Sequence, residues 1–533
     1  MSPTATIGLT GDLLVGAGAY RGTHGEIAAV DPRAGQELQP SYGLGGPADV
    51  RRAAELAEAA FDTYRETTPA VRAGFLTAIA DGLDALGDEL IARVTAETGI
   101  PAARVTGELA RTTNQLRLFA DVVRDGGWLG ARIDPALPER TPLPRPDIRR
   151  RLVPLGPVAV FAASNFPLAF SVAGGDTAAA LAAGAPVIVK AHSSHPGTSE
   201  LVGRVIQRAV ADLGLPEGVF SLLFGAGREV GIALVTDPRI KAVGFTGSRS
   251  GGLALVAAAQ ARPEPIPVYA EMSSINPVIV LPAALRGRGG EIGRALVASM
   301  TVGQGQLCTS PGLVFAVDGP GVAEFVAAAA EALRAVPAAP MLSAGIQQAF
   351  AEGVERLRTA TGVEIAAAGE AGDGIAAPGQ AHLFRTTNAE LRDNPALREE
   401  VFGASSLIVT VNSMAELRDT VAGLEGQLTL TLHADDADLD AARALLPLLE
   451  RKAGRIIVNG WPTGVEVGPA MVHGGPFPAT SDPRTTSVGT AAIERFLRPV
   501  AYQNLPAGLL PAGLDDANTL GLPRRVDGRF DGR

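Results

Sequence analysis

FAASNFPLAFSVAGGDTAAALAAGAPVIVK, residues 161–190, decides the fold, because it is the most apolar stretch of the chain. Apolar runs begin and end it, and an Ala-rich segment of helical composition lies between them. Asn165, Pro167 and Asp176 interrupt the stretch, which excludes a membrane span of about 20 uninterrupted apolar residues. A buried strand, a helix and a second buried strand in this order predict a βαβ unit with parallel strands.

The same alternation continues in two series of short β-branched runs. The first comprises VAVFAAS (158–164), APVIVKAH (185–192), VFSLLFG (219–225), KAVGFTG (241–247) and VYAEMSS (268–274). The second comprises NPVIVLP (276–282), GLVFAVD (312–318), SSLIVTV (405–411), LTLTLHA (428–434) and GRIIVNG (454–460). Amphipathic helices are predicted over 48–66, 71–96 and 101–125. Two α/β domains with parallel sheets follow, with the break near 270–276.

Two segments fall outside this pattern. TPLPRPDIRRRLVPLGP (141–157) carries repeated prolines, which exclude a helix and a central strand, so it is predicted to be a connector or an edge strand. The end of the chain, 506–533, is rich in Gly and Pro and is predicted to be an extended tail over the surface.

The composition excludes several classes of protein. The 533 residues carry 46 Lys and Arg against 56 Asp and Glu, a net charge of −10, which argues against general affinity for nucleic acid. A single cysteine cannot form an intrachain disulfide, so a disulfide-stapled secreted domain is excluded. The first residues, MSPTATIGLTGDLLVG, lack the basic start and apolar core of a signal peptide. We therefore expect a cytoplasmic protein that does not enter a membrane.

One predicted strand-to-helix turn suits a phosphate. The fingerprint GxGxxG is incomplete wherever it begins to match, and no Walker A sequence occurs. GFTGSRSGG (244–252), however, has Gly247 and Gly252 at such a turn, where glycine lets the backbone approach a phosphate closely. Ser248 adds a possible hydroxyl donor. A glycine-rich turn without any ligand is the alternative.

The only cysteine, Cys308, lies in GQGQLCTSPG (303–312), between a Gln/Gly run and a turn. A lone intracellular cysteine is commonly a small buried apolar residue. It can also be a nucleophile, and its own surroundings leave both interpretations open.

Several short motifs occur in one order along the chain. They are SNFP (164–167), VIVKAHSS (187–194), GFTGSRSGG (244–252), AEMSS (270–274), GQLCTSPG (305–312) and EEVFGASS (399–406). The series resembles the aldehyde dehydrogenase superfamily over residues of about 40 to 500. A glutamate followed some three to four dozen residues later by a cysteine is the specific part, here Glu271 and Cys308. GGPFPATSDPRTTSVGTAAIERFLRPVAYQN (474–504) is similar to the α-ketoglutaric semialdehyde dehydrogenase branch.

The resemblance implies a catalytic set. Cys308 would attack the aldehyde as a thiolate, and the Asn165 amide with the Cys308 backbone N–H would stabilise the oxyanion. Glu271 would activate the water that hydrolyses the thioester, and a carboxylate near an apolar sheet is expected to have a raised pKa. Relatives that transfer the acyl group to coenzyme A usually lack this glutamate, so the expected product is a free acid.

The resemblance also implies cofactor contacts. Lys190 matches the residue that bonds the adenosine ribose, and Glu400 and Phe402 match the residues beside the nicotinamide and its ribose. Ser193 stands where many NAD-preferring relatives carry Glu, which would repel the 2′-phosphate of NADP. Arg228 would pair with that phosphate, or is simply a solvated residue at a helix start. NADP is therefore expected, with NAD also usable.

Two histidines, His192 and His195, flank the same turn, but no further ligand pattern accompanies them, so no metal site is expected.

The substrate would meet a cation and an apolar tunnel. Arg111, in ARTTNQLRLFA, is expected to face the tunnel and receive the substrate carboxylate, with Gln115 one turn further on the same face. The alternative for Arg111 is an ordinary surface position. Expected tunnel walls are Phe166, Phe170, Trp461 and Phe477.

The implied architecture is α/β, with two Rossmann-like parallel-sheet domains and a small β oligomerisation arm. The expected boundaries are 1–137 and 157–271 for the NAD(P)-binding domain, 272–484 for the catalytic domain, 138–156 and 485–505 for the arm, and 506–533 for the tail. Such an arm leaves a sheet edge that needs a partner chain, so a homodimer or homotetramer is expected.

Three functions remain at this point. The first is NADP-dependent oxidation of α-ketoglutaric semialdehyde (2,5-dioxopentanoate) to 2-oxoglutarate. The second is a broad-specificity or fatty aldehyde dehydrogenase, which a longer apolar tunnel would favour. The third is an inactive cofactor-binding structural protein, against which the intact set of Asn165, Glu271 and Cys308 argues.

Overall fold

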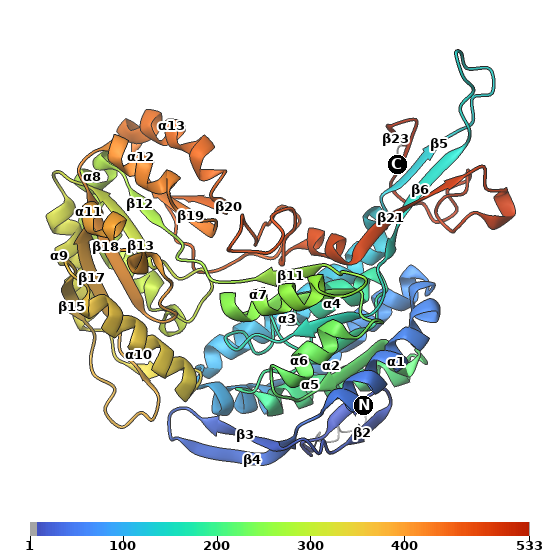
Figure 1. The fold of residues 1–533 in the computed structure, drawn as a ribbon, viewed down its shortest axis with the longest axis horizontal. Helices are drawn as coiled ribbons and strands as arrows, with labels where there is room; N and C mark the ends of the chain where they lie inside the picture. Colours follow the sequence, from blue (N-terminus) through green and yellow to red (C-terminus); the bar gives the residue numbers. More distant parts are fainter. Residues whose placement is uncertain (1–7, 532–533) are drawn as a thin grey trace.

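A seven-stranded sheet forms the core of the first half of the chain (Figure 1) in the computed structural model, which describes residues 8–531. Its order is β11 (Val268–Glu271), β10 (Ala242–Thr246), β7 (Val158–Phe161), β8 (Val187–Lys190), β9 (Phe220–Leu223), β1 (Leu13–Val15) and β2 (Gly18–Tyr20). The first five strands are parallel, as predicted, whereas β1 and β2 add antiparallel. We call this the first sheet.

One helix of this half, α4 (Gly175–Ala183), accounts for the apolar character of residues 161–190. The other helices are α1 (Pro47–Arg65), α2 (Pro69–Thr98), α3 (Ala102–Asp125), α5 (Pro196–Asp212), α6 (Glu229–Thr236) and α7 (Arg249–Gln260). Every residue of α4 is buried. A helix buried on all sides has no polar face, which is why its sequence shows no amphipathic pattern.

A second seven-stranded sheet lies in the other half. Its order is β15 (Glu364–Ala368), β17 (His382–Thr387), β18 (Ser405–Val411), β13 (Leu313–Val317), β12 (Val278–Val280), β19 (Gln427–His433) and β20 (Ala453–Val458). All neighbours are parallel except β15 and β17. Its helices are α8 (Pro282–Met300), α9 (Val322–Arg334), α10 (Ala344–Thr359), α11 (Asn388–Asp393), α12 (Met414–Ala422) and α13 (Leu439–Leu449). The five predicted strands of this sheet are confirmed, but β15 and β17 were missed because polar residues interrupt HLFRTT and EIAAA is mostly alanine.

A five-stranded sheet forms a projecting arm (Figure 1), in the order β21 (Leu497–Gln503), β6 (Ile148–Pro154), β5 (Ala131–Asp134), β22 (Arg524–Val526) and β23 (Arg529–Asp531). Residues 141–147 form a connector, as predicted, but the prediction of an edge strand is wrong, because β6 pairs with β21 and β5 on its two sides. The run of alternate prolines precedes β6, and Pro154 is its last residue, so the middle of the strand keeps its N–H donors.

The end of the chain also differs from the expected extended tail. Strands β22 and β23 form a hairpin, and β22 pairs parallel with β5. Asp527 and Gly528 both have positive φ at its turn, which is the Asp-Gly signal of a tight hairpin. The arm sheet therefore takes strands from three separate parts of the chain, including β5 from within 1–137.

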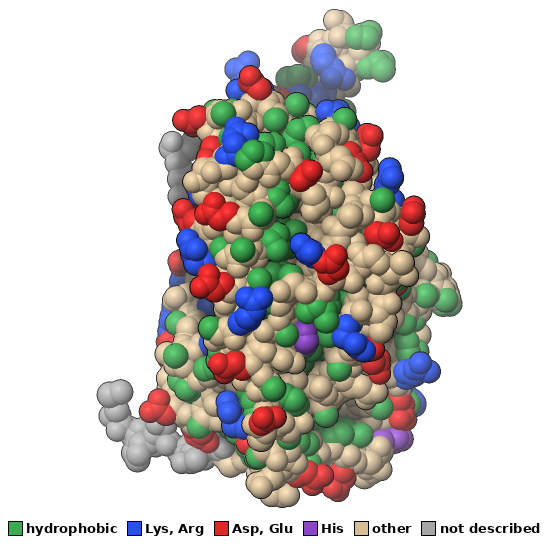
Figure 2. All heavy atoms as spheres, turned by 90° about the vertical axis from the view of Figure 1, so that its left-hand side faces the viewer, with side chains coloured by type: hydrophobic (Ala, Val, Ile, Leu, Met, Phe, Trp, Pro, Cys, Tyr) green, Lys and Arg blue, Asp and Glu red, His purple; other side chains and the backbone are tan. Residues whose placement is uncertain are grey.

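Smaller elements complete the fold. Antiparallel pairs join β3 (Glu26–Asp31) to β4 (Gln36–Gly43) and β14 (Ala339–Pro340) to β16 (Pro378–Gly379). On the face shown in Figure 2, acidic and basic side chains are interspersed, and neither sign forms a continuous patch. Within residues 8–531, no helix has both the length and the apolar character needed to cross a membrane.

Candidate active site

The site lies where the carboxyl ends of the first-sheet strands meet loops that lead into the second sheet. Glu271 is the last residue of β11, and Lys190 is the last of β8. Cys308 lies in the loop before β13, and Glu400 lies in the loop before β18. Residues that follow strands of one sheet thus face residues that precede strands of the other, and a cavity of about 440 Å³ lies between them.

Three reactive groups converge in this cavity. The Cys308 Sγ atom is 3.4 Å from His473 Nε2, and the same nitrogen is 2.9 Å from Glu271 Oε1. The Sγ, imidazole and carboxylate atoms all lie within 4.8 Å of one another. Because an ionised carboxylate can only accept, the short contact to Glu271 requires the proton on Nε2. His473 was not predicted; it directly precedes the Gly474-Gly475 pair of a quoted motif, which was the available signal.

The second oxygen of Glu271 is also held. Ser487 Oγ donates to Glu271 Oε2 at 2.7 Å, and both side chains are buried. Burial alone would raise the pKa of Glu271, but the interaction with His473 and the Ser487 hydroxyl outweigh it and hold the pKa below its ordinary range. The expected raised pKa is therefore wrong, because the carboxylate is buried among donors rather than apolar groups.

The pKa of the Cys308 thiol is shifted in the opposite direction from that of Glu271. Burial raises the pKa of Cys308 well above its ordinary value, and the neighbouring Glu271 carboxylate raises it further. At neutral pH the resting pair is therefore a protonated thiol beside an ionised carboxylate. Such a pair can pass one proton from sulfur to oxygen as the sulfur attacks a carbonyl carbon.

Asparagine amides fix the loop that carries Cys308. The Asn165 side-chain amide donates to Gln306 O at 3.0 Å, so it lies beside the nucleophile loop, as an oxyanion donor must. Asn276, which sequence reasoning missed, donates to Cys308 O at 2.8 Å and to Ser310 O at 3.0 Å. Its positive φ, common for asparagine, was not visible in the sequence.

The predicted phosphate turn lines the same cavity through Gly247 and Ser248. A Cβ on Gly247 would lie 2.7 Å from the Phe245 ring, so a larger residue there would require that ring to move. Ser248 Oγ caps α7 by accepting from Gly251 N at 3.2 Å, which leaves the other N–H groups of the helix start for an anion. Gly252 instead packs against Met272, so its role is close approach of α7 to the sheet.

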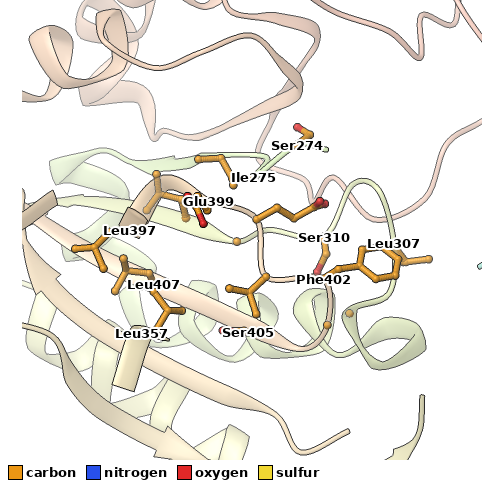
Figure 3. Close-up of a pocket in the computed structure, with 16 residues that line it drawn as sticks. Ser274, Ile275, Leu307, Ser310, Leu357, Leu397, Glu399, Phe402, Ser405 and Leu407 are labelled. Carbon is orange, nitrogen blue, oxygen red and sulfur yellow. The ribbon is translucent and has the colours of Figure 1, made fainter. Parts of the chain in front are cut away.

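Glu400 and Phe402 line the same cavity. Burial raises the pKa of Glu400 to about 7, although Ser273 and Ser274 lower it by hydrogen bonding. Figure 3 shows the residues that line a second pocket, among them Phe402, Ser310 and Glu399. Phe402 therefore contributes to the lining of both pockets.

The outer end of the cavity is more open. Ser193 lines it and is exposed, and Lys190 lies half-buried at the end of β8, where burial lowers its pKa. Arg228 is exposed at the start of α6. A cavity lined by the start of α7, by carboxylates and by a thiol fits an extended dinucleotide.

The structure brings together most of the predicted substrate contacts. The Arg111 guanidinium lies 5.7 Å from the centroid of the Phe166 ring and 5.2 Å from that of Phe170, and the Phe170 ring is 6.2 Å from His473. Burial lowers the pKa of Arg111, against the opposing effects of Glu108, Cys308 and Glu271. The surface alternative for Arg111 is therefore wrong. Gln115 is buried, and its Nε2 donates to none of the described residues.

Two predicted tunnel walls lie elsewhere. The Trp461 ring packs on His433, 4.8 Å between centroids, and against residues of the second-sheet core. Phe477 is 61% exposed, so no tunnel encloses it. Trp461 and Phe477 each follow an apolar or Gly-rich run. Composition alone did not reveal the direction in which either side chain points.

Comparison with known proteins agrees with this arrangement. The sequence profile described as "Aldehyde dehydrogenase family" matches residues 20–476. The chain is 58% identical over 524 residues to alpha-ketoglutaric semialdehyde dehydrogenase 2 of Azospirillum brasilense, covering 98% of this chain and all of that protein. It is 50% identical over 481 residues to alpha-ketoglutaric semialdehyde dehydrogenase of Acinetobacter baylyi, covering 90% and 91%.

Solved structures share the fold. The lactaldehyde dehydrogenase of Escherichia coli aligns with a TM-score of 0.80 at 22% identity, covering 92% of this chain and 98% of that one. Aldehyde dehydrogenase C of Pseudomonas syringae, solved with NAD+ and octanal, aligns with a TM-score of 0.79 at 21% identity, covering 93% and 97%.

Proposed function

The chain belongs to the aldehyde dehydrogenase family of NAD(P)-dependent oxidoreductases, and we propose that its substrate is α-ketoglutaric semialdehyde, oxidised with NADP to 2-oxoglutarate. The names of two relatives, 58% and 50% identical to this chain, support this substrate. The observation in this structure that carries the proposal is that Arg111 has buried N–H groups with no acceptor among the described residues.

Arg111 has free donors in the right place for a keto acid. Its Nε and Nη2 atoms are buried and donate to none of the described residues. The two phenylalanine rings occupy the neighbourhood of its flat guanidinium, but the N–H groups point along the guanidinium plane. Nε and Nη2 form one side of that plane, and such a fork binds two adjacent oxygens. The far end of 2,5-dioxopentanoate offers adjacent oxygens on its carboxylate and its ketone.

The reaction begins at Cys308. As Sγ forms a bond to the aldehyde carbon, the thiol proton passes to Glu271, whose lowered pKa keeps it ionised and ready. His473 and Ser487 hold the two carboxylate oxygens, so the base keeps its orientation. The carbonyl oxygen becomes an oxyanion within reach of the Asn165 amide and the Cys308 N–H, and each such donor contributes about 3 kcal/mol.

Hydrolysis uses the same carboxylate. Bound in the cavity, NAD(P) supplies the acceptor for the hydride that leaves the thiohemiacetal carbon. Glu271 first releases to solvent the proton that it took from the thiol. It then takes a proton from the water that attacks the thioester and passes it to the sulfur, so that the free acid leaves and Cys308 is a thiol again. Both steps need Glu271 ionised, which its hydrogen bonds ensure.

The cofactor would lie along the cavity from Ser193 to Cys308, held by Lys190, the start of α7, Glu400 and Phe402. We propose NADP as the preferred form, because exposed Ser193 brings no charge to the outer end of the cavity. Arg228, exposed at the start of α6, is proposed to pair with the 2′-phosphate. NAD, which lacks the 2′-phosphate, would still bind through the other contacts.

We also propose a homodimer or a dimer of dimers. Strand β21 ends the arm sheet, and strand β20 ends the second sheet with Val458 58% exposed. Exposed sheet edges pair readily with other chains. Light scattering after gel filtration should give the mass of two or four chains; the mass of one chain would contradict this.

A steady-state panel tests the proposed reaction. The purified protein is assayed with 2,5-dioxopentanoate, succinic semialdehyde, pentanal and decanal, each with NADP and with NAD. We expect the highest kcat/KM with 2,5-dioxopentanoate and NADP, and 2-oxoglutarate as the product whether or not coenzyme A is present. A preference for decanal would favour a fatty aldehyde dehydrogenase, and reduction of neither cofactor with any aldehyde would favour an inactive binding protein.

A further inference from the structure

Two side chains of helix α3, one helical turn apart, form hydrogen bonds with the segment that carries Asn165. Arg104 and Glu108 are four residues apart, so both side chains leave the same face of the helix. The segment from Asn165 to Ala169 has no regular secondary structure to fix it. Its position therefore depends on contacts from outside, and the two charged side chains of α3 provide them.

Arg104 makes the first contact. Its Nη2 donates to the backbone O of Asn165 at 3.1 Å, and its guanidinium lies 5.4 Å from the centroid of the next side chain, Phe166. The same guanidinium covers the nucleophile loop at Gly303, where φ is +59° and a Cβ would lie 2.5 Å from Arg104 Nη1. Arg104 thus touches both the backbone of the proposed oxyanion donor and the loop that leads to Cys308.

Glu108 makes the second contact. Its Oε1 accepts from Leu168 N at 2.8 Å and from Ala169 N at 3.0 Å. The side chain is only 5% exposed, and buried N–H groups without a partner are costly, so these bonds hold the segment firmly. With Arg104 at the start of the segment and Glu108 at its end, neither the rotation nor the translation of Asn165 is free.

We propose that Arg104 and Glu108 form a clamp that positions the Asn165 amide as an oxyanion donor, and that Arg104 acts on the reaction through Asn165 rather than through its contact with the loop at Gly303. Both are positioning residues. The inference rests on the proposed role of Asn165 in the reaction. The amide has to donate to the substrate oxygen beside Cys308. Asn165 Nδ2 already lies 3.0 Å from the backbone O of Gln306, which is two residues before Cys308 in the chain. A displacement of about 1 Å at such a donor can reduce the rate by about 10²-fold.

A double-mutant cycle tests the clamp. The variants are Arg104→Met, Asn165→Ala and the combination of both, with Arg104→Lys as the conservative variant. Arg117→Met is the matched control, because Arg117 lies on the same helix but pairs with Asp81 and Asp84 away from the cavity. For each, kcat and KM are measured with 2,5-dioxopentanoate and with pentanal, and thermal unfolding checks that the protein is folded.

We expect Arg104→Met to lower kcat by about 10²-fold for both aldehydes with little change in either KM. Arg104→Lys, which keeps a donor, should recover part of the loss, and Arg117→Met should behave as the unmodified protein. In the Asn165→Ala background, Arg104→Met should cost nothing further, because the amide it positions is already absent.

Three outcomes would overturn the clamp. If Arg104→Met lowers kcat by the same factor with and without Asn165, it acts independently of the amide. If it raises only the KM for 2,5-dioxopentanoate, Arg104 binds substrate directly. If it leaves kcat unchanged while Asn165→Ala lowers it, the clamp is unnecessary. By contrast, an Asn165→Ala variant with full kcat would contradict the proposed role of Asn165 itself, which keeps the two failures distinguishable.

Discussion

The two ends of the cavity are built in different ways. At the inner end, Glu271 and His473 are buried, and each is fixed by hydrogen bonds shorter than 3.0 Å. At the outer end, Ser193 is exposed, and so is Arg228 at the start of α6, the proposed partner of the 2′-phosphate. The inner end is therefore rigid before any ligand arrives, and the outer end is open to solvent.

This difference predicts how each end responds to substitution. A buried hydrogen-bonded set works as a unit, so removing one member disables the others and costs orders of magnitude in rate. An exposed residue that only distinguishes two cofactors changes binding by the strength of one partly screened interaction. The following experiments compare the two ends, from the largest expected effect to the smallest.

Replacement of the nucleophile should have the largest effect. We expect Cys308→Ser to lower kcat by about 10⁴-fold or more, because the hydroxyl is a far weaker nucleophile than a thiolate. The rate is measured from the absorbance of the NADPH that forms. Fluorescence titration measures NADP binding, which should be retained. Turnover within about tenfold of the unmodified protein would show that Cys308 is structural.

Removal of the base should cost less. Glu271→Gln keeps the shape but cannot accept a proton, and we expect kcat to fall by about 10²- to 10³-fold. Because its pKa lies below the ordinary range, Glu271 is ionised throughout the neutral region. The log kcat profile of the unmodified protein should therefore show no acid limb from this group between about pH 6 and about pH 8. An acid limb in that range that disappears in Glu271→Gln would contradict the geometry.

Changes at the outer end should alter cofactor choice rather than rate. Ser193→Glu places a carboxylate where the 2′-phosphate is proposed to bind, and we expect kcat/KM for NADP to fall by about tenfold or more while that for NAD changes little. Arg228→Ala should produce a smaller shift in the same direction. Equal changes for both cofactors would mean that neither residue meets the 2′-phosphate.

The smallest effect concerns pH. Glu400 has a pKa raised to about 7, so it is mostly neutral at about pH 6 and mostly ionised at about pH 8. An ionised carboxylate accepts a ribose hydroxyl more strongly, so the KM for the cofactor should fall a few-fold as the pH rises through 7. Glu400→Gln should flatten this dependence, and an unchanged slope in that variant would assign it to another group.

The sequence predicted which residues meet at the inner end of the cavity, but it did not predict the pKa of Glu271. The ten strand runs indicated both parallel sheets, because buried strands are continuous apolar runs that composition reveals directly. The pair of Glu271 and Cys308 came from the resemblance and does converge in space. The lowered pKa of Glu271 could not be predicted, since it depends on His473 and Ser487, more than 200 residues away along the chain.

Elsewhere the missing information was the direction of side chains. Phe477 and Phe170 are alike in sequence terms, yet one is exposed and the other lies beside Arg111. The arm strand β6 was underestimated because its prolines precede the strand rather than interrupt it. The hairpin of β22 and β23 did have a local signal, the Asp527-Gly528 pair, within a segment whose Gly and Pro content suggested only a tail.

The most direct test of the account is the substrate preference of an Arg111 variant. Arg111→Met keeps a long side chain beside the two phenylalanine rings but removes the fork of donors. The quantity to measure is the ratio of kcat/KM for 2,5-dioxopentanoate to that for pentanal, with NADP. We predict that this ratio is high in the unmodified protein and falls by about 10²-fold in Arg111→Met, while kcat/KM for pentanal changes little. An unchanged ratio would contradict the proposal that Arg111 recognises the keto acid.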